Sequence, residues 1–108
     1  MNKTTTPEGL RETIMSKKEV TIIDVRRRAD FDADTQMIVG AIYRDPEQVE
    51  HWSKDLREGQ DVVVYCVRGG SVSKSVSEEL KTKNVKVSFI EGGIAAWKES
   101  GGELQEKI

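Results

Sequence analysis

The 108-residue chain contains one cysteine, Cys66, and no other residue has a comparable potential for nucleophilic chemistry. Cys66 follows the apolar run 62–65 and precedes Val67, Arg68 and two glycines. A thiolate is a strong nucleophile, whereas a lone cysteine at a strand end is more often a small buried hydrophobic residue. The glycine-containing turn after Cys66 favours the reactive thiol, because such a turn can stabilise negative charge on the sulfur.

Residues 67–71 are therefore predicted to form an anion-binding loop around the sulfur. Gly69 and Gly70 allow the backbone to curl so that successive N–H groups point inward, and the N-terminus of the next helix adds partial positive charge. Both effects favour the thiolate over the thiol. Arg68 adds a formal positive charge, and the hydroxyl groups of Ser71 and Ser73 can donate hydrogen bonds into the same loop.

Two further segments are expected at the same end of the sheet as this loop. Asp24, Val25 and Arg26 end the first long predicted strand, and residues 91–93 (EGG) follow another. In open parallel sheets, ligands bind at the carboxyl ends of the strands. The three segments therefore predict one site around Cys66.

Periodicity predicts the elements that position this site. β-branched and apolar runs predict strands at residues 20–25, 62–66 and 85–90, with a further apolar segment at 38–43. Capping residues and apolar spacing predict helices at residues 7–19, 29–34, 46–57, 72–84 and 94–100. Alternating strands and helices imply right-handed crossovers. We expect one α/β domain of residues 1–108, with a parallel central sheet of about four to five strands and helices on both faces.

Four segments also occur in a characteristic order. They are residues 22–26 (IIDVR), 39–42 (VGAI), 63–71 (VVYCVRGGS) and 91–97 (EGGIAAW). Together they resemble the motifs of the rhodanese-like domains, or sulfurtransferases, along nearly the whole chain. Two positions depart from the family pattern. Val39 replaces a proline whose usual preceding Gly-His is missing, and Val67 stands where many members have an arginine directly after the cysteine.

The resemblance implies sulfur transfer through a persulfide on Cys66. The family takes a sulfane sulfur from a small anionic donor, such as thiosulfate or a persulfide, and passes it to cyanide or a thiol. It implies that the backbone of residues 67–71 binds the anionic persulfide. It also implies that Asp24 accepts hydrogen bonds that hold the site together, with Arg26 in the same network. No cofactor is implied, and a sulfur-relay protein is a further expected partner.

Other kinds of protein share a similar architecture. Phosphatases and arsenate reductases have loops that resemble a cysteine, five residues and an arginine. In this chain the residue that follows Cys66 after five others is Val72, not an arginine. A non-catalytic interaction module has the same fold, although it does not require Cys66 in such a loop. A stoichiometric sulfur carrier requires the same cysteine and stays open as an alternative.

The composition of the chain argues against several other classes of protein. A formal net charge of -2 argues against a nucleic-acid partner. No apolar run approaches the ~20 residues of a membrane span, and the N-terminal segment has no apolar core typical of a secretory signal. The chain is therefore expected in the cytoplasm. One cysteine and one histidine allow neither an internal disulfide nor a typical protein-only metal site.

The three consecutive arginines 26–28 are followed by Asp30, Asp32 and Asp34, which indicates a solvated charged turn. As an alternative, Arg27 or Arg28 leans over the pocket and attracts anionic donors.

Overall fold

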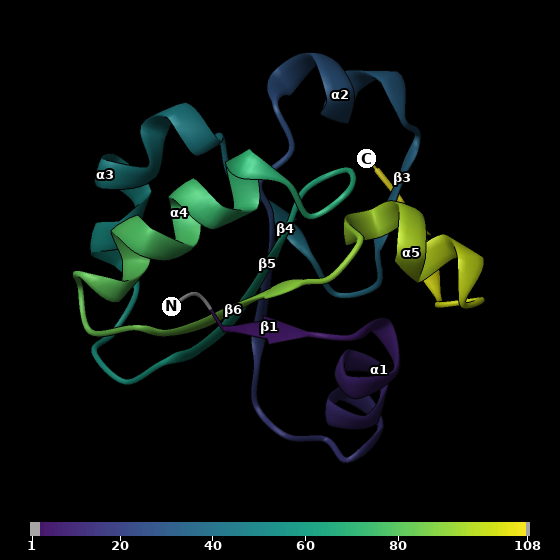
Figure 1. The fold of residues 1–108 in the computed structure, drawn as a ribbon, viewed down its shortest axis with the longest axis horizontal. Coiled ribbons are helices and arrows are strands. Elements are labelled where there is room, and N and C mark those ends of the chain that lie inside the picture. The colour runs from purple at the N-terminus through teal and green to yellow at the C-terminus, as the bar shows by residue number, and fades with distance from the viewer. Residues whose placement is uncertain (1–2, 108) are drawn as a thin grey trace.

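A five-stranded parallel sheet forms the centre of the computed structural model, which describes residues 3–107 (Figure 1). Its strand order is β1-β6-β5-β2-β4, and each neighbouring pair is parallel. The strands are β1 (Thr4–Thr5), β2 (Thr21–Asp24), β4 (Ile42–Tyr43), β5 (Asp61–Tyr65) and β6 (Lys86–Ile90). The expected α/β fold with a parallel sheet is thus confirmed.

Helices cover both faces of this sheet. They are α1 (Pro7–Met15), α2 (Arg28–Ala33), α3 (Val49–Trp52), α4 (Ser71–Lys81) and α5 (Gly93–Glu99). Figure 1 shows α3 and α4 on one side of the sheet and α1 and α5 on the other. The side chain of Thr6 caps α1 by accepting a hydrogen bond from the Gly9 N–H at 3.0 Å, as the Thr-Pro-Glu start predicts.

The middle strand, β5, carries the chain to Cys66. Its side chains alternate, so that Val62 and Val64 pack in the core cluster beneath α3 and α4. Val63 and Tyr65 point to the opposite face and pack in the cluster beneath α1 and α5. A strand buried on both faces is a rigid support, so the position of Cys66 is set by the core.

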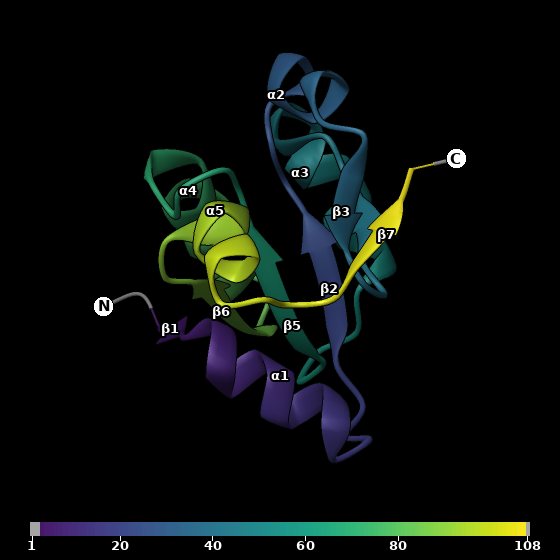
Figure 2. The same ribbon diagram turned by 90° about the vertical axis from the view of Figure 1, so that its right-hand side faces the viewer.

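A second, two-stranded sheet differs from the prediction. β3 (Gln36–Ile38) and β7 (Leu104–Glu106) pair antiparallel beside the main sheet (Figure 2). The segment 38–43 is therefore not one run, because β3 ends at Ile38 and β4 begins at Ile42. β1 and β7 were not predicted at all. These strands have two or three residues each, and they form through pairing with distant segments rather than through an apolar pattern of their own.

The helix predicted over residues 46–57 is also wrong as one element. The chain forms a 3-10 turn η1 (Pro46–Gln48), then α3, then a second 3-10 turn η2 (Ser53–Asp55). The carbonyl of Asp45 explains the first break. It accepts from the Gln48 N–H at 3.0 Å and from the Trp52 indole N–H at 2.7 Å, so it is engaged by a tight turn and a side chain.

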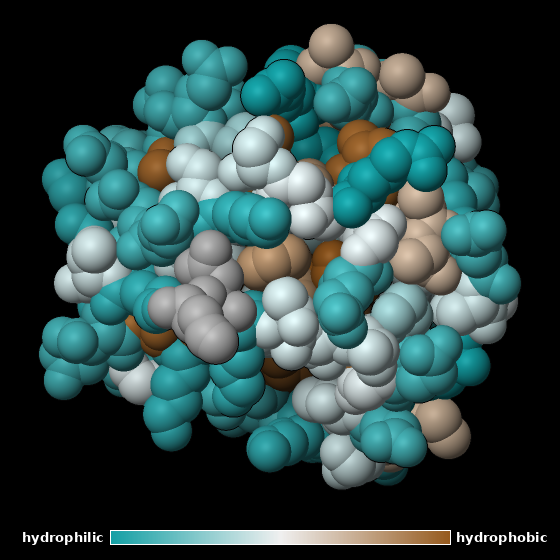
Figure 3. All heavy atoms as spheres, viewed as in Figure 1, coloured by the Kyte–Doolittle hydropathy of each residue, from teal (hydrophilic) through white to brown (hydrophobic). Residues whose placement is uncertain are grey.

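The surface is mainly polar on the face shown in Figure 3, where apolar residues appear only in small separate areas. Large exposed apolar side chains in the described residues are Met15 and Ile42. Within residues 3–107, none of the helices combines the length and the apolar composition that a membrane span requires.

Candidate active site

Cys66 lies at the carboxyl end of β5, directly before a four-residue loop that leads into α4. The Cys66 residue is 6% exposed and lines a hollow at the surface. This hollow of about 270 Å³ is lined by Cys66, by residues of the loop and by the start of α4: Cys66, Val67, Arg68, Gly70, Ser71 and Val72. The opposite wall consists of Arg27 and Asp30, which come from the segment after β2.

The backbone of the loop is held by the start of α5. The Ile94 N–H donates to the Cys66 carbonyl and the Ala95 N–H donates to the Val67 carbonyl, each at 3.0 Å. In a trans peptide the C=O and N–H groups point in opposite directions, and the described residues contain no cis bond. The N–H groups of Val67 and Arg68 therefore point away from α5.

Two glycines make this contact between the loop and α5 possible. A Cβ atom at Gly93 would overlap the Cys66 and Val67 carbonyl groups, and one at Gly69 would lie 2.8 Å from the Ile90 oxygen. Both residues also have a positive φ, of 60° at Gly93 and 69° at Gly69. Only glycine meets both demands without strain.

The N–H donors of the loop have no partner in the part of the chain that the structure describes. Within residues 3–107, the N–H groups of residues 67–70 donate no hydrogen bond to another residue. α4 begins at Ser71 after the N-cap Gly70, which has no side chain that could cap the helix. Side chains cap α1 and η1, whereas α2, α3 and α5 also begin without a side-chain cap. An uncapped helix start beside unpaired N–H groups can bind an anion.

The two serines expected in this loop occupy different environments. Ser71 is exposed and lines the Cys66 hollow. Ser73 is fully buried in α4 and does not line that hollow. Its hydroxyl group has no hydrogen-bond partner among the described residues.

Asp24 and Arg26 form a buried ion pair behind the site. The Arg26 guanidinium donates to Asp24, with an Nη2–Oδ2 distance of 2.6 Å, and both residues are at most 1% exposed. Arg26 also donates to Asp34 at 3.0 Å and to the Gln36 carbonyl at 3.1 Å. Burial alone would lower the pKa of Arg26, but the hydrogen bond and charge of Asp24 outweigh it and raise this pKa. The pair thus joins β2 to the α2–β3 segment.

Tyr65 is a member of this network that sequence reasoning missed. Its hydroxyl group donates to Asp24 Oδ2 at 2.9 Å and accepts from the Ile38 N–H at 3.1 Å. Burial and the neighbouring Asp24 charge raise the pKa of Tyr65 far above its ordinary value, so it stays protonated. The available signal was a single tyrosine in an otherwise aliphatic strand, immediately before Cys66.

Asp34 extends the network to α5. Its carboxylate accepts from Lys98 at 2.7 Å as well as from Arg26. Partial burial would raise the pKa of Asp34, but the hydrogen bonds from Lys98 and the Gln36 N–H lower it overall. β2, β3 and α5 are therefore tied together beside the Cys66 loop.

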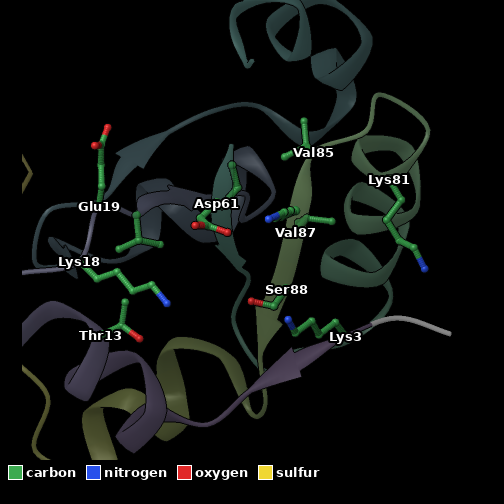
Figure 4. Close-up of a pocket in the computed structure, with 12 residues that line it drawn as sticks. Lys3, Thr13, Lys18, Glu19, Asp61, Lys81, Val85, Val87 and Ser88 are labelled. Atoms are coloured by element: carbon green, nitrogen blue, oxygen red, sulfur yellow. The ribbon is translucent and has the colours of Figure 1, made fainter. Parts of the chain in front are cut away.

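Another hollow, of about 370 Å³, lies at the opposite end of the sheet (Figure 4). Lys3, Lys18 and Lys86 line it together with Asp61 and several valines. Asp61 and Lys86 begin β5 and β6, whereas Cys66 follows the last residue of β5, so this hollow is separate from the cysteine. Within residues 3–107, no three His, Cys, Asp or Glu side chains are grouped so that they could hold a metal ion.

Known proteins resemble the chain in sequence and in fold. A tRNA 2-selenouridine synthase of Shewanella piezotolerans is 30% identical over 73 residues, which are 68% of this chain but only 20% of that protein. The rhodanese-like domain of an Anabaena protein has a TM-score of 0.83 and 28% identity, covering 100% of this chain and 82% of the other. A rhodanese-like domain protein of Staphylococcus aureus has a TM-score of 0.81 and 26% identity, covering 98% and 99%.

Residues 6–100 match the sequence pattern of one protein family, the rhodanese-like domain. This match includes β2, the Cys66 loop and the α5 start, so it spans the elements that build the site. The chain belongs to the rhodanese-like domain family, which is associated with sulfur transfer.

Proposed function

We propose that the protein is a sulfurtransferase whose Cys66 carries the transferred sulfur as a persulfide. The observation that carries this proposal is the orientation of the loop after Cys66. Two of its carbonyl groups are turned to α5, and its N–H groups have no partner within the described residues. Such donors would stabilise first the Cys66 thiolate and then the anionic persulfide.

The loading step needs no cofactor. The Cys66 thiolate attacks the outer sulfur of thiosulfate, and a new S–S bond forms. The S–S bond of thiosulfate breaks at the same time, and sulfite leaves with the electron pair. The step needs no external oxidant or reductant, because the outer sulfur atom of thiosulfate only moves from sulfite to the Cys66 thiolate.

Arg68, the cation within the loop itself, would bind the anionic donor. It is exposed, lines the Cys66 hollow and makes no ion pair with another residue in the described part of the chain. A guanidinium group can hold a sulfonate with two parallel hydrogen bonds. We assign Asp24, Arg26 and Tyr65 a supporting role, because none of them lines the Cys66 hollow.

Discharge completes the reaction with cyanide or a thiol as acceptor. The acceptor attacks the outer sulfur of the persulfide, the enzyme S–S bond breaks, and the Cys66 thiolate is regenerated. A stoichiometric carrier that hands its sulfur to a relay protein would use the same loaded form. The two roles differ only in whether a small acceptor is turned over repeatedly.

Intact mass spectrometry after incubation with thiosulfate tests the proposal. The wild type should gain one sulfur atom, and Cys66→Ser, with the same fold, should gain none. Production of thiocyanate from cyanide then separates a catalyst from a carrier. A wild-type protein that stays at its original mass would overturn the persulfide proposal and favour an interaction module.

A further inference from the structure

The hollow at the start of β5 and β6 is cationic in a chain whose net charge is negative (Figure 4). Four lysines and two carboxylate side chains line it, which gives a formal charge of +2, against -2 for the whole chain. The hollow at Cys66 has a formal charge of +1, from Arg27 and Arg68 against Asp30. A volume of about 370 Å³ lies within the range of ~300–1,000 Å³ that is typical of small-molecule sites. Charge and volume together indicate a site for a small anion.

Four of the charged side chains offset one another. Asp61 and Lys86 are partners in the register of β5 and β6, so one charge of each sign lies at the start of these strands. Lys81 and Glu19 also line the hollow, and Figure 4 shows both side chains extending away from its middle. These two add one further charge of each sign. The positive balance therefore comes from the remaining two lysines.

Lys3 and Lys18 supply this positive charge. Figure 4 shows their side chains extending from opposite sides toward the middle of the hollow, where the Ser88 hydroxyl group lies. Within residues 3–107, none of these three side chains forms an ion pair or a hydrogen bond with another residue. An anion between the two ammonium groups would thus displace no existing interaction.

The backbone of β6 adds a further donor. In a parallel sheet, the N–H groups of successive residues point alternately to the two neighbouring strands. The Lys86 N–H donates to the Gln60 carbonyl, on the β5 side. The Phe89 N–H donates to the Lys3 carbonyl, on the β1 side, so the Val87 N–H points to the β1 side as well. The pairing of β1 with β6 begins only at Phe89, so in the described part of the chain this N–H has no partner, and Val87 lines the hollow.

We propose that this hollow binds the phosphate group of a small organic phosphate. The phosphate would lie between the ammonium groups of Lys3 and Lys18 and accept hydrogen bonds from the Ser88 hydroxyl and the Val87 N–H. A phosphate monoester is close to a dianion at neutral pH and has three acceptor oxygens, which suits a formal charge of +2 and donors on several sides. The site is separate from the sulfur chemistry, because Cys66 lies beyond the opposite end of β5.

NMR titration of the full chain labelled with nitrogen-15 tests the proposal. Glycerol 3-phosphate and acetate are added separately at constant ionic strength. We expect glycerol 3-phosphate to shift the amide signals of Val87 and Ser88 with saturation. Acetate carries a single charge and should bind roughly two- to five-fold more weakly, which is the range for one exposed ion pair.

Four variants assign the charges. Lys3→Gln and Lys18→Gln should each weaken the binding of glycerol 3-phosphate roughly two- to five-fold, again through one exposed ion pair. Asp61→Asn should tighten binding by a similar factor, because it removes a carboxylate that lines the hollow. Lys83→Gln is the matched control, because Lys83 is an exposed lysine before β6 that does not line the hollow.

Several outcomes would overturn the assignment. Binding that is unchanged in both Lys3→Gln and Lys18→Gln would do so, and so would an equal loss in Lys83→Gln, which would show a response to net charge alone. Shifts confined to the amides of residues 67–70 would place the phosphate at the Cys66 loop instead. Cys66→Ser should bind glycerol 3-phosphate like the wild type, so the result does not depend on whether a persulfide forms.

Discussion

At the scale of single residues, the Cys66 hollow places two kinds of charge near the sulfur. Arg27 and Arg68 are cationic, whereas Asp30 on the wall opposite the loop is anionic. Thiosulfate is a dianion, so these side chains should act on its capture in opposite directions. Each can be changed without altering the buried network of Asp24, Arg26 and Tyr65, because that network does not line the hollow.

Arg68→Ala should slow persulfide formation from thiosulfate about 5- to 30-fold. The reason is the loss of one charge-assisted contact worth on the order of 1–2 kcal/mol. Discharge of loaded protein to a neutral thiol should change much less. Rapid mixing with thiosulfate, followed by intact mass measurement, gives the loading rate. An unchanged loading rate would show that Arg68 does not bind the donor, and equal losses in both steps would show a damaged loop.

Asp30→Asn should have the opposite effect and speed loading by thiosulfate roughly two- to five-fold. An exposed negative charge repels the dianion, and removing it changes the barrier by less than about 1 kcal/mol. The effect should shrink as salt is added. Asp32→Asn is the control, because Asp32 pairs with Arg28 and does not line the hollow. A slower Asp30→Asn variant would contradict the prediction.

At the scale of elements, the position of the loop depends on how closely α5 approaches it. The two hydrogen bonds from Ile94 and Ala95 orient the loop carbonyls, and Gly93 allows the approach. The loop is therefore shaped by a segment almost thirty residues away in the sequence. The N–H donors offered to an anion follow from this packing.

Gly93→Ala should abolish most of the persulfide formation and destabilise the protein by about 1–3 kcal/mol, because its φ of 60° and the overlap with the loop both cause strain. Gly59→Ala is the matched control. Gly59 has a φ of 78° but its Cβ position is open, so that variant should lose stability alone. Thermal unfolding and thiosulfate loading measured on both variants check this. Normal loading by Gly93→Ala would contradict the proposed role of α5.

Elements that are specified by their own residues could be predicted from the sequence, whereas elements that depend on distant segments could not. β2 and β5 were predicted because runs of valine and isoleucine specify buried strands on their own. β3 and β7 depend on each other across more than sixty residues, and three-residue strands of mixed composition, QMI and LQE, give no such signal. At the site, the loop after Cys66 could be predicted from its glycines. The position of Asp30 in the wall of the Cys66 hollow could not, because exposed acidic residues look alike until the fold places them.

At the scale of the whole molecule, the ion pairs beside the site connect distant parts of the chain. Asp34 joins Arg26 after β2 to Lys98 on α5, and Tyr65 joins β5 to the start of the same network through Asp24. The stability of the fold should therefore respond to pH through these groups. Folding lowers the pKa of Asp34.

Asp34→Asn should lower the free energy of unfolding at neutral pH by about 1–2 kcal/mol, through loss of charge-assisted hydrogen bonds. A carboxyl group whose pKa is lowered by folding stabilises the protein above its unfolded pKa, about 4, and this contribution is lost as the pH falls through the folded value. The difference between wild type and variant should therefore shrink below about pH 4. Urea unfolding at several pH values measures it, and a constant difference would contradict the role of the charge.

The lengths of the strands affect how strongly the protein aggregates at high concentration. Both outer strands of the main sheet, β1 and β4, have only two residues, while the longer β2, β5 and β6 each have a neighbour on both sides. Aggregation by strand addition requires a long exposed edge with unpaired backbone groups. The valine run of β5, an apolar segment of high β-propensity, lies in the middle of the sheet. The fold therefore shields this segment from edge-to-edge association for as long as the sheet stays intact.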